Sequence, residues 1–235
     1  MPDRLLVMGW HNVAATYGFP ARGEQAERGF ESQMKSLARA ANVIPLHEAL
    51  SRLSAGQSLP RRAVAITFDD GYRDNLTLAL PLLERLGLPA TFFLVPELLS
   101  GNVDAWWETV GWALSASSRD TFSWEGMNFA LDRSNGQSAY SPIVRALKRR
   151  NRDDRDRSMS ELLELLAPPG EHKDPGVLLR RLAEIPIPNK RNCPRQMASL
   201  AILPFRDSSR WRYGTVIFKT CPIPFGGGPK PTFDT

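Results

Sequence analysis

The stretch Ala63-Val64-Ala65-Ile66-Thr67-Phe68-Asp69-Asp70-Gly71-Tyr72 carries the strongest structural signal in this chain of 235 residues. Its first six residues are a continuous apolar run rich in β-branched side chains, the pattern of a strand that is covered on both faces. Leucines then line one face of a predicted helix over 76–86, and residues 90–95 form a second apolar run. Strand, helix and strand in succession predict a βαβ unit with parallel strands. The sequence therefore predicts an α/β protein.

The same alternation extends outward from this unit. Pro81 is expected to bend the helix over 76–86, and Gly87 suits a left-handed residue at its end. We expect the chain between Trp106 and Pro169 to be mainly helical. Nearer the N-terminus the pattern predicts a buried strand over 5–10, a helix over 29–41, a short strand over 42–46 and a helix over 47–53.

Residues 186–235 differ in character from the rest of the chain. They carry 8 Lys and Arg against 2 Asp and Glu, whereas residues 1–185 carry 22 against 23. This basic, proline-rich tail is expected to be poorly ordered, or to be the product of a shifted reading frame. It has no stacked aromatics or groove-reading motif, so no nucleic-acid partner is expected. Cys193 and Cys221 are interpreted as unpaired thiols without function.

No apolar stretch approaches the roughly 18 residues that a membrane-spanning helix needs. The N-terminal run Leu5–Trp10 is too short for the core of a signal peptide, and no small-residue cleavage site follows it. These two observations predict a cytoplasmic location.

Asp69, Asp70 and Gly71 form the candidate site. Adjacent carboxylates directly after a buried strand repel each other and are costly to bury, and a divalent metal removes that cost. In parallel α/β folds the carboxyl ends of the strands form the active face. Gly71 permits a tight turn that leaves backbone N–H groups near a substrate oxygen. The alternative is that both aspartates merely cap the next helix.

The segment Thr67-Phe68-Asp69-Asp70-Gly71 resembles the signature of the NodB-type polysaccharide deacetylases, carbohydrate esterase family 4. The likeness extends to Trp10-His11-Asn12-Val13, to residues 42–46, 60–66 and 79–93, and to Trp106-Trp107-Glu108. It covers about residues 5 to 180. The resemblance implies a partial, distorted (β/α) barrel with parallel strands, with an incomplete NodB-like domain over 1–185 and the irregular tail over 186–235.

The resemblance also implies a reaction, the metal-dependent removal of N-acetyl groups from a polysaccharide or oligosaccharide. Asp69 would be the general base that deprotonates a metal-bound water, and Asp70 a ligand of the metal, usually zinc. The backbone N–H of Tyr72, beside Gly71, would assist as an oxyanion donor. His11 would lie near the site.

The chain departs from the family pattern in its histidines. The family supplies two metal ligands from a His-Ser/Thr-x-x-His segment, but His11, His47 and His172 do not have that spacing. His47 and His172 are interpreted as surface residues. Because a catalytic zinc normally needs three protein ligands, an inactive remnant that binds a carbohydrate or a partner stays open beside the deacetylase. A third alternative is a metallophosphatase that uses Asp69 and Asp70, but the nucleophile motif of that chemistry is not present.

Overall fold

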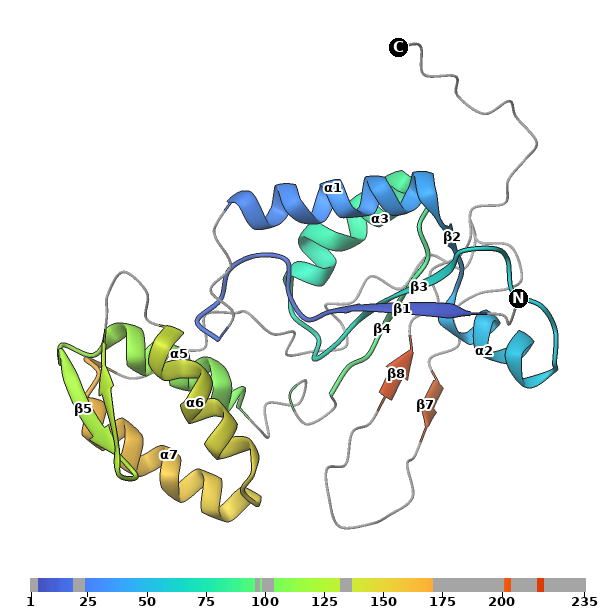
Figure 1. Ribbon diagram of the computed structural model, residues 1–235. Helices are drawn as coiled ribbons and strands as arrows, with labels where there is room; N and C mark the ends of the chain where they lie inside the picture. Colours follow the sequence, from blue (N-terminus) through green and yellow to red (C-terminus); the bar gives the residue numbers. More distant parts are fainter. Residues whose placement is uncertain are drawn as a thin grey trace.

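A parallel sheet is built around the central strand β3 (Ala63–Phe68) in the computed structural model (Figure 1). β1 (Leu5–Trp10) pairs with β3 along its whole length, while β2 (Asn42–Val43) and β4 (Ala90–Phe92) pair with its amino and carboxyl ends. The structure describes residues 4–18, 24–95, 98, 104–131, 137–170, 201–203 and 215–217. All three pairings are parallel, which confirms the predicted α/β class; within the described residues the sheet is open, a partial barrel.

Helices α1 (Glu24–Ala40) and α3 (Leu80–Leu86) lie side by side over the sheet (Figure 1). α2 (Leu46–Ser54) follows β2 and packs near the start of β3. A π-helical segment, η1 (Asn75–Ala79), directly precedes α3. Because η1 runs directly into α3, Pro81 lies in the first turn of α3 but inside a continuous helical run over 75–86. The helix changes from π-helical to α-helical next to this proline, a residue that removes a helical hydrogen-bond donor. The predicted left-handed end at Gly87 is confirmed, with φ of 65°.

Aromatic rings fill the space between β3 and these helices. Phe68 and Phe92 stack with their ring centroids 4.9 Å apart. The ring centroids of Trp10 and Phe30 lie 5.9 and 6.0 Å from that of Phe68. Such pairs stabilise a core beyond the burial of their area. Phe68 is the last residue of β3, so the cluster holds the strand rigidly just before Asp69.

The expectation that β1 is buried is wrong. The exposed fractions of Leu6 and Val7 are 56% and 48%, and these neighbours point to opposite faces of the strand. β1 pairs only with β3 among the described strands, so it lies at an edge of the sheet. An apolar run cannot distinguish an edge strand from a central one.

A second hydrophobic cluster lies among α5 (Trp106–Ala116), α6 (Gln137–Lys148) and α7 (Arg152–Leu166). The predicted helical character of this region is confirmed for these three elements. It is wrong for residues 121–130, where β5 (Thr121–Trp124) and β6 (Met127–Ala130) form an antiparallel hairpin.

The tail contributes two short strands to the described structure, β7 (Ala201–Leu203) and β8 (Thr215–Ile217), paired antiparallel. Most of the tail, which was expected to be poorly ordered, lies outside the described residues. The same is true of the predicted domain boundary between residues 185 and 186 and of Cys193 and Cys221. Among the described helices, none is long and apolar enough to cross a membrane.

Candidate active site

The carboxyl ends of three strands meet at the turn that carries Asp69. The N–H of Asp69 donates to the carbonyl of Trp10 at 2.9 Å, which continues the pairing of β1 with β3. On the other side, the N–H of Phe93 donates to the carbonyl of Phe68 at 2.7 Å. Backbone bonds on both sides therefore fix the position from which the two aspartates project.

The turn itself uses left-handed backbone at two consecutive residues, Asp70 with φ of 67° and Gly71 with φ of 77°. The N–H of Gly71 donates to the carbonyl of Asp69 at 2.9 Å. A Cβ atom at Gly71 would lie 2.9 Å from Cδ2 of Leu94. Glycine is needed there both for its conformation and for the close approach of Leu94.

His11 faces the aspartates from the end of β1. Its Nε2 lies 3.7 Å from Oδ2 of Asp70, and the exposed side-chain fractions are 46% for His11 and 20% for Asp70. The structure thus brings together His11 and Asp70, residues 59 positions apart that the resemblance assigned to one site. Solvent reaches the pair, so a substrate can also approach it.

Burial is the main cause of the altered acidity of both aspartates. It raises the pKa of Asp69 above the ordinary value of 3.8, and the nearby His11 opposes this shift. Burial likewise raises the pKa of Asp70, with His11 lowering it, Asp69 raising it and Lys148 lowering it. A carboxylate whose pKa is raised is a stronger base, as a general base requires.

The side chain of Tyr72 is buried and points to α5 rather than into the turn. Its hydroxyl donates to Oε1 of Glu108 at 2.8 Å and accepts from Nε1 of Trp107 at 2.8 Å. Glu108, which is 2% exposed, also accepts from Thr16 Oγ1 at 2.8 Å and from the N–H of Gly18 at 2.7 Å. Tyr72 is therefore an anchor of the turn through its side chain, whereas the role predicted for its backbone N–H stays a prediction.

Sequence reasoning missed two carboxylates that organise the site. Glu108 was noted only as part of a resembling tripeptide, and Asp74 was not singled out. Oδ2 of Asp74 accepts from the N–H groups of Val13 and Ala14, both at 2.7 Å. An acidic residue directly before a helix was the available signal for Asp74, but that signal suggests capping and not a contact with residues 13 and 14.

The described residues do not complete a metal site. They contain no group of three or more His, Cys, Asp and Glu side chains placed to hold one ion. His11 and Asp70 are close enough to be two ligands, fewer than the three that a catalytic zinc normally takes from the protein. His47 lies in α2, and His172 lies outside the described residues.

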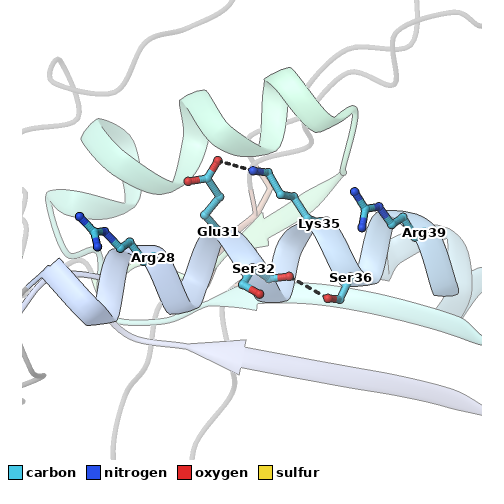
Figure 2. Close-up of a pocket in the computed structure, with 6 residues that line it drawn as sticks. All are labelled: Arg28, Glu31, Ser32, Lys35, Ser36 and Arg39. Atoms are coloured by element: carbon cyan, nitrogen blue, oxygen red, sulfur yellow. Dashed lines mark hydrogen bonds and ion pairs between the residues drawn. The ribbon is translucent and has the colours of Figure 1, made fainter. Parts of the chain in front are cut away.

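A groove along α1 is separate from this turn (Figure 2). It is lined entirely from that helix, and Figure 2 shows Lys35 directed at Glu31, with Nζ and Oε1 3.0 Å apart. Glu31 also pairs with Arg85 on α3. None of its lining residues belongs to the strand ends, so the groove is a solvated charged face and not the site of chemistry. Its lining is Arg28, Glu31, Ser32, Lys35, Ser36 and Arg39.

Comparison with known proteins finds a family match in the part of the chain that carries the aspartate turn. Residues 56–117, which include β3, the aspartate turn and α5, match the model of the polysaccharide deacetylase family. A protein of Bacillus subtilis (strain 168) assigned as polysaccharide deacetylase YxkH is 33% identical over 95 residues. That match covers 40% of this chain and 33% of the relative, so the chain spans about a third of the relative's length.

Solved structures of deacetylases are also similar to the chain. The Streptococcus pyogenes deacetylase PplD, in complex with acetate, is 19% identical, with a TM-score of 0.37 and coverage of 45% of this chain and 48% of that one. IcaB from Ammonifex degensii is 25% identical, with a TM-score of 0.34 and coverage of 53% and 43%. On the family match over residues 56–117, the resemblance to the polysaccharide deacetylases is confirmed for this part of the chain.

Proposed function

We propose that the chain is a hydrolase that removes N-acetyl groups from an N-acetylated polysaccharide or oligosaccharide. The observation that carries the proposal is the turn at the converging strand ends, where Asp69 and Asp70, which lie inside the matched segment 56–117, face His11 at the end of β1. The family match supports the reaction class. It does not name the sugar, so the substrate is stated as a chemical class.

In this proposal Asp69 is the general base. It accepts a proton from a water molecule whose oxygen attacks the carbonyl carbon of the acetamide, and the C–N bond then breaks. The proton returns to the leaving nitrogen, so the products are acetate and a sugar amine. The backbone N–H of Tyr72 is the proposed donor to the developing oxyanion, since the N–H of Gly71 is bonded to the carbonyl of Asp69. The raised pKa of Asp69 favours its part as a base.

Metal dependence, with zinc as the expected ion, is proposed from the family alone. Asp70 would be a ligand, and the described residues hold no group of three or more His, Cys, Asp and Glu side chains placed to complete the site. We therefore derive no step through the metal. Calorimetric titration of the chain with zinc tests this part by itself: Asp70→Asn should weaken binding, and equal binding by the variant would remove Asp70 from the ligand set.

Acetate release from N-acetylglucosamine oligomers, measured with and without added zinc, tests the function. Asp69→Asn should lower the rate by about 100- to 10,000-fold, the usual contribution of a general base, because the amide cannot take the proton of water. Asp120→Asn, at an exposed carboxylate directly before β5, is the matched control and should leave the rate unchanged.

The competing function is a carbohydrate-binding or partner-binding module without turnover. Saturable binding of the oligomers, unaffected by zinc and without acetate release, would replace the hydrolase by this module. Release that is equal in the wild-type chain and in Asp69→Asn would instead remove Asp69 from the proposed chemistry.

A further inference from the structure

We propose that Asp74 is a positioning residue that holds the turn after β1 so that His11 faces Asp70. This inference rests on the proposed function, because the placement of His11 matters only if the strand ends form the reaction site. Asp74 lies four positions beyond Asp70, at the start of the helical segment that follows the aspartate turn. Residues 70–74 therefore include both Asp70 and the side chain that binds the segment after His11.

The contacts of Asp74 are specific and buried. One oxygen, Oδ2, accepts two backbone N–H groups, from Val13 and Ala14, each at 2.7 Å. Bonds between a carboxylate and backbone N–H groups are among the shorter and stronger hydrogen bonds in proteins. The other oxygen, Oδ1, is buried and has no hydrogen-bond partner among the described residues. The carboxylate is therefore aimed at the 13–14 backbone and not shared with solvent.

His11 lies in a short segment that is held by hydrogen bonds at both ends. On its amino side, the carbonyl of Trp10 accepts from the N–H of Asp69 at 2.9 Å. On its carboxyl side, Asp74 holds Val13, whose side chain is 5% exposed and packs in the aromatic cluster. His11 and Asn12 are thus the only residues between two fixed points. A segment this short has little freedom to turn the imidazole away from Asp70.

Glu108 holds the same segment further along, at Thr16 and Gly18. Those contacts leave Ala14 and Ala15 between themselves and the span of His11, which ends at Val13. Glu108 can hold the later part of the segment while the part next to His11 moves. The placement of His11 therefore depends on Asp74.

Two substitutions at Asp74 separate positioning from folding. Asp74→Asn keeps one carbonyl oxygen that can accept both N–H groups, whereas Asp74→Ala leaves Val13 and Ala14 without an acceptor. Leu162→Ala, in the other hydrophobic cluster, is the control for general loss of stability. Each is made in the full chain, alone and together with Asp70→Asn, and urea midpoints are measured for all of them.

The direct readout is the imidazole resonance of His11 in two-dimensional NMR, which reports its surroundings without turnover. In the wild-type chain and in Leu162→Ala, Asp70→Asn should shift this resonance. In Asp74→Ala the shift should fall to less than about half, and in Asp74→Asn it should persist. On N-acetylglucosamine oligomers, Asp74→Ala should lower kcat by roughly tenfold or more with little change in KM, since a misplacement of 1 Å can cost on the order of 100-fold.

An unchanged His11 response in Asp74→Ala, with only a lower urea midpoint like that of Leu162→Ala, would overturn the inference. Equal loss of the response in Leu162→Ala would overturn it as well, because any destabilisation would then move His11. If the wild-type chain releases no acetate, the proposed function fails, and the NMR comparison still decides whether Asp74 positions His11.

Discussion

At the scale of single residues, Asp70 is held at an energetic disadvantage in two ways. Its φ of 67° lies in the left-handed region, which costs a non-glycine residue roughly 1–2 kcal/mol. Burial also raises the pKa of its carboxyl group, and the adjacent Asp69 adds to that rise. Residues kept in such conformations concentrate at functional sites, where the surrounding structure holds them. The backbone of Asp70 thus agrees with its proposed place in the site.

We expect Asp70→Gly to raise the free energy of unfolding by about 1 kcal/mol while it abolishes function. Relief of the left-handed strain outweighs the larger entropy of glycine in the unfolded chain, which costs roughly 0.5–1 kcal/mol. Urea denaturation measures the change. Arg62→Gly is the matched control, since Arg62 has φ of 56° and lies outside the aspartate turn. A gain for Asp70→Gly below that of Arg62→Gly would contradict the prediction.

At the scale of elements, the β5–β6 hairpin is defined by its turn. Glu125 and Gly126 have φ of 51° and 75°, the two consecutive positive values of the hairpin turn whose twist matches that of the strands. Phe122 and Phe129 stack across the pair with centroids 5.0 Å apart. Alternating residues around Glu-Gly are a recognisable hairpin signal, which the expectation of a helical region overlooked.

Gly126→Ala should therefore lower the free energy of unfolding by roughly 1–2 kcal/mol, because alanine pays the left-handed penalty that glycine avoids. Gly29→Ala should act in the opposite direction. Gly29 lies inside α1, and nothing lies within 4 Å of its added Cβ, so the variant gains roughly 0.5–1 kcal/mol of helix stability. Thermal unfolding of both variants checks the pair. If both variants changed the free energy of unfolding in the same direction, the left-handed turn conformation would not explain the effect of Gly126→Ala.

At the scale of the whole molecule, Glu108 connects the helical cluster to the segment that carries the aspartate turn. It lies in the first turn of α5, whose Val110 and Leu114 belong to the helical cluster, yet it accepts from Tyr72 beside the aspartate turn. Burial, followed by the charge of Glu108, raises the pKa of Tyr72 far above its ordinary value. The phenol therefore stays protonated and donates. A buried network of this kind is stabilising only while every member keeps its partners.

A double-mutant cycle measures this link. Tyr72→Phe and Glu108→Gln should each lower the free energy of unfolding by about 1–3 kcal/mol, since each leaves a buried partner unsatisfied. Their coupling should be about 0.5–3 kcal/mol. Tyr72→Phe combined with Ser117→Ala, which removes the buried bond from Ser117 Oγ to the carbonyl of Leu166, should be additive within about 0.5 kcal/mol. Additivity in the first pair would mean that α5 and the aspartate turn are not coupled through this bond.

Local patterns in the sequence determined the central strand, the parallel βαβ unit, the left-handed residue at Gly87 and the placing of Asp69 and Asp70 at a strand end. Each depends on residues close together in the chain, so composition and periodicity suffice. Only the tertiary structure decided that β1 is exposed, that Tyr72 reaches Glu108 and that Asp74 holds Val13 and Ala14. Those contacts join residues 36 to 61 positions apart. A residue's type shows that it needs a partner, but the packing of distant segments chooses which partner it finds.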